Sequence, residues 1–202
     1  MNTLHRYEGK SLEALKNQCL EELNTAIDDL YIFETEETGL LKSKKYIIEV
    51  ITKKEIIDQI KDFINELSKK MNIEIHSEIR IEENNINVLL VTDNNNIMIG
   101  KDGKTLNSIQ IILRQYMNNL NKFGLRIIVD VGNYKNKKLK NLEYEVRKIC
   151  KDVLKTKVEV KLDPMNSFER RKVHSIVSEF ECLESASYGE DPNRYTVIKF
   201  KD

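Results

Sequence analysis

Through the middle of the chain, segments whose apolar residues recur at helical spacing alternate with short apolar runs typical of β-strands. Apolar residues recur at helical spacing in residues 53–71 and again in residues 106–120, which predicts two amphipathic helices. The run at residues 86–91 is rich in β-branched and other apolar residues, and strands are also predicted at 73–81 and 125–131. The order of helix, two strands, helix and strand predicts an α+β fold for this part.

Weaker patterns of the same kinds occur toward both ends. A helix is predicted directly after Ser11, followed by strands at residues 31–36 and 46–51. Further along, helices are predicted at residues 137–154 and after Pro164, which punctuates a helix start. In the first of these helical patterns we expect six residues to face inward: Leu12, Leu15, Cys19, Leu23, Ile27 and Leu30.

Breaks in composition divide the chain into three small domains, which we expect at residues 1–52, 53–133 and 134–202. No stretch rich in Pro, Gly or Ser separates the first domain from the second. A domain of about 50 residues is marginally stable by itself. We therefore expect the first domain to dock on another domain or on a second chain.

Composition indicates a cytoplasmic protein without stable membrane insertion. One third of the residues are charged, no apolar stretch reaches the roughly 18 residues of a membrane span, and no apolar signal region opens the chain. The three cysteines, Cys19, Cys150 and Cys182, are scattered, and the chain has three histidines. We expect no disulfide framework, no metal site and no cofactor.

A Gly-x-x-Gly loop separates the predicted strand at 86–91 from the following helix. Gly100 and Gly103 lack Cβ, so the main chain can turn tightly and bring its N–H groups close to a phosphate. Lys101 and Lys104 add positive charge where the helix begins, and a helix N-terminus favours anions. Asp102 brings a negative charge into the loop, and we expect it to cap the helix.

The sequence Ile-Gly-Lys-x-Gly-x-Thr-Leu-x-x-Ile-Gln around this loop resembles a KH domain, in the arrangement found in prokaryotes. The resemblance implies that the loop, including Asp102, clamps the backbone of about four nucleotides. It also implies that Ile97 and Ile99, beside the loop, pack against the bases. Single-stranded RNA is the implied partner, because duplex does not fit such a groove.

The triplet Gly103-Lys104-Thr105 opening a helix leaves a P-loop nucleotidase as a remote alternative, with Asp130 as a magnesium ligand. A phosphate-binding loop of that kind requires a glycine five residues before its second glycine. Met98 occupies this position. We therefore expect no catalytic residues and no enzymatic activity.

Basic residues concentrate in the last third of the chain, where 16 basic residues face 12 acidic ones after Gly132 although the whole chain has zero net charge. Arg170 and His174 are four residues apart on a predicted helix and so share one face, beside Arg171. We expect both on the exposed arc of the helix. A guanidinium and an imidazole there can contact phosphate, ribose or a base edge.

The sequence Met-Asn-x-Phe-Glu-Arg-Arg-x-Val-His, with the Ser-x-Ser-x-Gly-x-Asp-Pro-x-Arg pattern that follows it, resembles the R-three-H domain, a module that binds single-stranded nucleic acid. The resemblance implies nucleic-acid contacts by four residues of this chain. These are Arg170, Arg171, His174 and Arg194.

A KH domain directly followed by an R-three-H domain is the organisation of the bacterial Jag proteins, also called SpoIIIJ-associated or KhpB proteins, and the chain resembles this family throughout. Its Gly39-Leu40-Leu41-Lys42 segment departs from the family's basic hairpin motif. The resemblance implies a post-transcriptional regulator linked to envelope growth, division or sporulation. A protein adaptor remains the alternative, pairing with a small stand-alone KH protein or a second copy through its KH or N-terminal surface.

Overall fold

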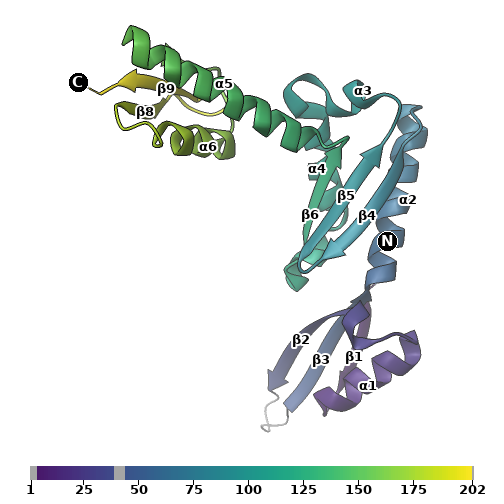
Figure 1. Ribbon diagram of the computed structural model, residues 1–202. Helices are drawn as coiled ribbons and strands as arrows, with labels where there is room; N and C mark the ends of the chain where they lie inside the picture. The colour runs from purple at the N-terminus through teal and green to yellow at the C-terminus, as the bar shows by residue number, and fades with distance from the viewer. Residues whose placement is uncertain (1–3, 39–43, 202) are drawn as a thin grey trace. The chain divides into compact units, whose positions relative to one another are not determined.

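The structure, a computed structural model, describes residues 4–38 and 44–201 and is shown in Figure 1. The chain forms two compact units, Met1–Gly132 and Asn133–Asp202. The described residues form helices and three three-stranded sheets, which confirms the α+β prediction. Within the described ranges no helix is long and apolar enough to cross a membrane. The segment Gly39-Leu40-Leu41-Lys42, which departs from the family's basic hairpin motif, lies outside the described residues.

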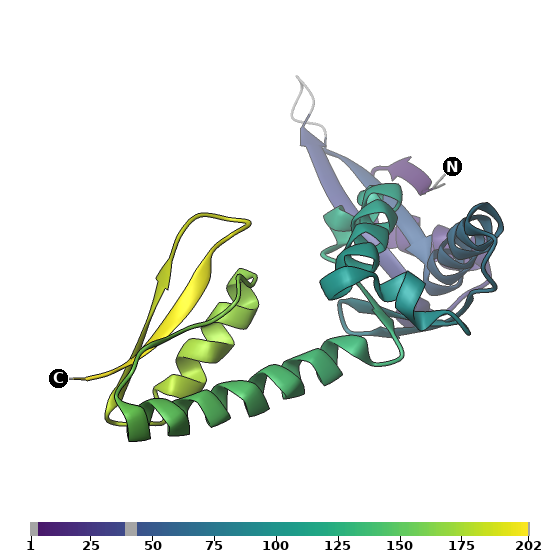
Figure 2. The same ribbon diagram turned by 90° about the horizontal axis from the view of Figure 1, so that it is seen from above.

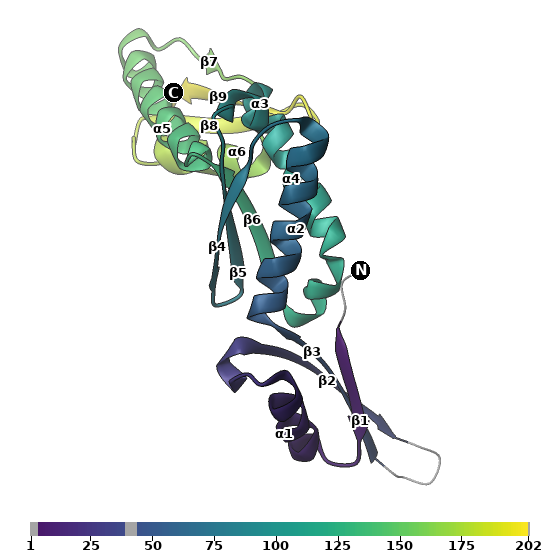
Figure 3. The same cartoon turned by 90° about the vertical axis from the view of Figure 1, so that its right-hand side faces the viewer.

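The first unit begins with an antiparallel sheet in the order β1-β3-β2, built from β1 (His5–Gly9), β2 (Leu30–Thr38) and β3 (Lys44–Thr52). Helix α1 (Leu12–Leu23) lies on one face of this sheet, as Figure 3 shows. The two predicted strands are confirmed and are longer than expected. The sequence pattern does not predict β1, because its five residues carry little apolar character.

Helix α1 is shorter than the helical pattern predicted, which placed inward-facing residues as far along as Leu30. It ends at Leu23, because Asn24 adopts the left-handed conformation (φ 45°) that terminates a helix. A 3-10 turn, η1 (Ile27–Asp29), follows and leaves Ile27 exposed, so the prediction that this residue faces inward is wrong. Leu30 is buried as expected, but from the first position of β2.

Helix α2 (Lys53–Met71) starts directly after β3 and confirms the prediction at 53–71. A reciprocal capping box fixes its start: Thr52 Oγ1 accepts from the Glu55 N–H at 3.0 Å, and Glu55 Oε2 accepts from the Thr52 N–H at 2.9 Å. No residue separates strand from helix, so the direction of α2 is set by the end of the N-terminal sheet.

The N-terminal sheet also contacts the part that follows it. Lys122 Nζ lies 2.7 Å from Glu49 Oε1, and the rings of Phe33 and Phe123 meet edge to face with centroids 6.4 Å apart. Lys122 and Phe123 belong to the 3-10 segment η3 (Asn118–Phe123). The docking expected for the small first domain is therefore made within its own chain.

The second sheet has the order β4-β5-β6, with β4 (His76–Glu82) antiparallel to β5 (Asn85–Val91) and β5 parallel to β6 (Arg126–Val131). Parallel neighbours need a crossover connection. Here the crossover runs through α3 (Asn95–Ile99), η2 (Lys101–Gly103), α4 (Lys104–Tyr116) and η3. The Gly-x-x-Gly loop therefore lies within a crossover whose two ends are fixed in one sheet.

Side chains of α4 hold the outer strand of this sheet. The Gln110 Oε1 accepts from the Val129 N–H at 3.0 Å, and the Arg114 Nε donates to the Ile127 carbonyl at 2.8 Å. Gln110 is buried, so its bond is shielded from water. These two contacts satisfy backbone groups on the edge of β6 and fix the helix against the strand.

The second unit packs two helices on one face of a sheet in the order β7-β9-β8, as Figure 2 shows. The apolar core between them includes Val146, Cys150, Val173 and Ile176. Of its helices, the first begins three residues before the predicted start at residue 137. The elements are α5 (Tyr134–Thr156), β7 (Val160–Lys161), α6 (Ser167–Val177), β8 (Leu183–Tyr188) and β9 (Tyr195–Phe200).

Candidate nucleic-acid interface

The loop between α3 and α4 has a backbone that requires glycine. Gly100 has φ 69°, and a Cβ added there would lie 2.1 Å from Thr105 Oγ1 and 3.0 Å from the Thr105 nitrogen. Gly103 has φ 83° and donates its N–H to the Gly100 carbonyl at 3.3 Å. The chain therefore turns within four residues and returns directly into the first turn of α4.

Positive charge surrounds this turn. Lys101 and Lys104 are exposed on either side of Gly103, at the N-terminal end of α4 where the helix dipole also favours an anion. The N-cap position of α4 is Gly103, one residue later than the prediction that Asp102 caps the helix. Asp102 is itself exposed, with a left-handed backbone at φ 57°. The turn thus presents two ammonium groups and one carboxylate to solvent.

Apolar side chains lie next to the loop on α3. Ile97 is 53% exposed and Ile99 is half-buried, whereas Met98 between them is fully buried in the core. The residue that stands where a P-loop requires glycine is therefore a core residue. Ile97 and Ile99 remain available beside Lys101, so apolar and basic groups adjoin at the turn.

The second predicted site differs from the expectation. Arg170 is only 8% exposed; its Nε donates to the Met165 carbonyl at 3.3 Å, and its Nη2 lies 3.9 Å from Asp191 Oδ1. His174 is half-buried, with Nδ1 2.7 Å from Ser185 Oγ and Nε2 2.9 Å from Ser187 Oγ. The prediction that both side chains lie on an exposed arc is wrong, because β8 packs over this face of α6.

The electrostatics of His174 follow from that packing. Burial, together with the positive charge of Arg170, lowers the pKa of His174 below its ordinary value. The imidazole is therefore neutral at pH 7, with one nitrogen donating and the other accepting. Ser187 continues the polar chain to Thr196 Oγ1 at 3.3 Å. His174 joins α6 to β8 and, through Ser187, to β9.

The other two predicted residues are more accessible. Arg171 is exposed, one position around the helix from Arg170. Arg194 is half-buried, its carbonyl accepts from the Met165 N–H at 3.1 Å, and its Nε has no hydrogen-bond partner within the described chain. Met165 thus brings Arg170 and Arg194 together, while Arg171 points outward. Of the four predicted residues, Arg170 and His174 therefore lie together, and Arg194 is linked to Arg170 through the backbone of Met165.

Cysteine and acidic side chains offer little for metal chemistry. Within the described residues no group of three or more His, Cys, Asp and Glu side chains could hold a metal ion. Cys19 and Cys150 are buried, and burial raises the pKa of both thiols. A thiol with a raised pKa is a weak nucleophile and a poor metal ligand at neutral pH. These two residues act as core side chains.

Comparison with known proteins identifies the class. Residues 57–131 match the family model described as KhpA/KhpB, KH domain, and residues 137–200 match that of the R-three-H domain. A Clostridium symbiosum protein named RNA-binding protein KhpB is 32% identical over 198 residues, covering 95% of this chain and 89% of that protein. The chain belongs to the KhpB family.

Two further relatives carry the same name. The Bacillus subtilis (strain 168) protein is 26% identical over 200 residues, which is 96% of each chain. The Streptococcus pneumoniae (strain D39) protein is 25% identical over 187 residues, covering 92% of this chain but 56% of that protein. The KH and R-three-H resemblances found in the sequence are thereby confirmed.

We expect Gly100→Ala to lower the free energy of unfolding by at least about 1 kcal/mol more than Gly124→Ala does. Gly124 also has a positive φ of 72°, but its ψ of 11° lies in the ordinary left-handed region and a Cβ there meets nothing within 4 Å. Gly100, with ψ −178°, lies in a region that is essentially restricted to glycine, so it carries both a larger backbone cost and the clash with Thr105. Urea denaturation followed by circular dichroism measures both variants. Equal losses would mean that the loop does not require glycine at position 100.

We expect the second unit to lose stability as pH falls below about 6.5. The unfolded chain protonates His174 near that pH, whereas the folded chain does so only at lower pH, so the unfolded state binds more protons there. Thermal unfolding of the intact chain between about pH 8 and pH 5 should show this decline, and His174→Gln should flatten it. A His174 ring pKa above 6.5 by proton NMR would contradict the account.

Proposed function

We propose that this chain binds single-stranded RNA in the cytoplasm and that the Gly-x-x-Gly loop holds the phosphate backbone. The observation that carries this proposal is the turn at Gly100, which only glycine fits, flanked by exposed Lys101 and Lys104 at the start of α4. Membership of a family whose relatives are named RNA-binding proteins supports the choice of ligand.

Single strands are preferred because their bases can be turned toward the protein. Exposed Ile97 and half-buried Ile99 lie beside the loop and offer apolar surface to an unstacked base. In a duplex the same bases are paired and stacked on each other. The loop then supplies backbone affinity and the isoleucines supply the preference for splayed bases.

The second unit contributes further contacts through Arg171 and Arg194. Arg171 is exposed and Arg194 is half-buried, so part of each side chain is open to solvent. Arg170 and neutral His174 act indirectly, since they hold α6, Met165 and β8 in place. Two weak modules on one chain raise each other's effective concentration on a long strand.

A protein-adaptor function is the second candidate, and the surface of α4 favours it. Ile111, Ile112 and Tyr116 are all exposed on this helix. A second copy of the chain or a small stand-alone KH protein would cover this apolar surface. We still propose three domains, at residues 1–52, 53–133 and 134–202. In this arrangement the middle domain would bind both RNA and a protein partner.

We infer that the chain has no enzymatic activity. We also infer that it acts after transcription, on RNA in the cell. Met98 removes the glycine that a nucleotide-binding P-loop needs, and the side chain of Asp130 accepts a hydrogen bond from the Val131 N–H at 2.9 Å. Sequencing of RNA crosslinked to the protein in cells would identify its transcripts. Enrichment of messages for envelope growth, division or sporulation is the outcome expected from the family resemblance.

Changing both loop lysines, Lys101→Glu with Lys104→Glu, should lower the affinity for a short single-stranded RNA by at least roughly tenfold at moderate salt. Attraction to phosphate is replaced by repulsion, while both side chains are exposed and the fold is kept. Electrophoretic-shift titration measures the affinity. Lys61→Glu with Lys70→Glu, two exposed positions on α2, gives the same change in net charge as a control.

Unchanged RNA affinity in the loop variant, with a normal circular dichroism spectrum, would show that the loop is not the clamp. Unchanged RNA affinity of the loop variant, together with self-association of the chain, would favour the adaptor function. Equal losses in the loop and control variants would instead mean that RNA responds to net charge and not to the loop.

A further inference from the structure

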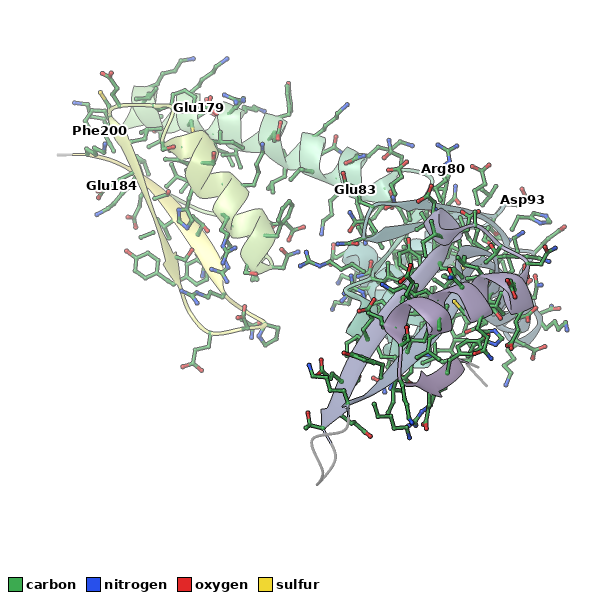
Figure 4. All side chains as sticks on the ribbon, turned by 90° about the horizontal axis from the view of Figure 1, so that it is seen from below. Arg80, Glu83, Asp93, Glu179, Glu184 and Phe200 are labelled. Atoms are coloured by element: carbon green, nitrogen blue, oxygen red, sulfur yellow. The ribbon has the colours of Figure 1, made fainter. Side chains whose placement is uncertain are left out.

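The sheet of the second unit has one face that neither of its helices covers. Cross-strand pairing places Tyr188 opposite Tyr195 and Ser187 opposite Thr196, so these pairs lie on opposite faces. The serine face meets His174 of α6. Figure 4 shows Glu184, which shares its face with Tyr188, projecting from β8 on the side away from α6. We call the face of Tyr188 and Tyr195 the outer face.

Two aromatic rings and a lysine adjoin on the outer face. The centroids of Tyr188 and Tyr195 are 6.2 Å apart, with the ring planes 33° from parallel. Tyr188 is 48% exposed and Tyr195 is half-buried. Lys161 of β7 places its Nζ 4.0 Å from the centroid of the Tyr195 ring. Tyr195 is thus held from two sides, while Tyr188 offers its ring to solvent.

We propose that Tyr188 stacks on a base of a single-stranded nucleic acid, supported by Tyr195, and that Lys161 contacts a phosphate of the same strand. Every base has a flat π-face, so an exposed ring on a rigid sheet binds it without regard to sequence. The proposal rests on the proposed function. It extends that function to residues outside the Arg170–His174 cluster.

The charges on and beside the outer face favour one path for the nucleic-acid backbone. Exposed Lys161 lies beside Tyr195, whereas the hairpin loop beyond Tyr188 carries exposed Glu190, which repels phosphate, and Asp191, whose Oδ1 lies 3.9 Å from Arg170 Nη2. The Lys199 and Glu184 pair, 2.8 Å apart, is close to neutral between them. The phosphate next to the stacked base is therefore expected at Lys161, toward β7.

Titration of the full chain with a fluorescein-labelled single-stranded RNA of mixed sequence, read by anisotropy, tests the proposal. Tyr188→Leu should weaken binding by about fivefold or more, the loss that one stacked base produces, whereas Tyr188→Phe keeps the ring and should bind like the parent. Tyr144→Leu removes a 73% exposed tyrosine from α5 of the same unit and should have no effect. Equal affinity of Tyr188→Leu and the parent would overturn the proposal.

Photocrosslinking of the unaltered chain to RNA containing 5-iodouridine gives a readout that does not depend on a variant folding. A crosslink mapped by mass spectrometry to Tyr188 or Tyr195 supports the proposal, and crosslinks confined to α6 or to residues 97–104 contradict it. The proposed function fails separately if the unaltered chain does not bind this RNA. It stands if only the loop-lysine variant loses affinity and Tyr188→Leu does not.

Discussion

The hydrogen bond between buried Gln110 of α4 and the backbone N–H of Val129 is the constraint on which the loop depends. With the bond from Arg114 to the Ile127 carbonyl, it fixes α4 along the edge of β6. Because β6 is parallel to β5, the crossover must return across the sheet, and its turn falls at Gly100. A buried amide left without its partner would cost about 1–3 kcal/mol, so helix and strand cannot slide independently.

The two units present charge to a ligand in different ways. In the first unit the ammonium groups of Lys101 and Lys104 stand at a backbone turn and a helix N-terminus, so local geometry concentrates positive charge although the whole chain is neutral. In the second unit Arg170 and His174 are drawn into the packing between α6 and β8. There they hold α6 against β8, and under the proposed function the accessible side chains around them would make the contacts.

The long helix at residues 53–71 and the Gly-x-x-Gly turn were predictable from the sequence, because a sustained apolar period and two glycines before a helix each have one good structural solution. The placement of Arg170 and His174 was not, although the spacing 170, 173, 174, 177 is that of the core stripe containing Val173 and Val177. Their polarity favoured an exposed face, and only β8, with serines directed at the ring, shows how they are buried. The contact of Gln110 with Val129 joins residues whose pairing no local pattern reveals.

We propose that the backbone of the glycine loop receives the phosphates of a single strand. Two-dimensional amide NMR of the full chain, titrated with a single-stranded RNA of about four nucleotides, tests it most directly. The largest shift changes are expected at the amides of Lys101, Asp102, Gly103 and Lys104, and a stably paired RNA duplex should leave the shifts of these amides unchanged. Changes confined to the exposed residues of α4, with these loop amides unmoved, would contradict it.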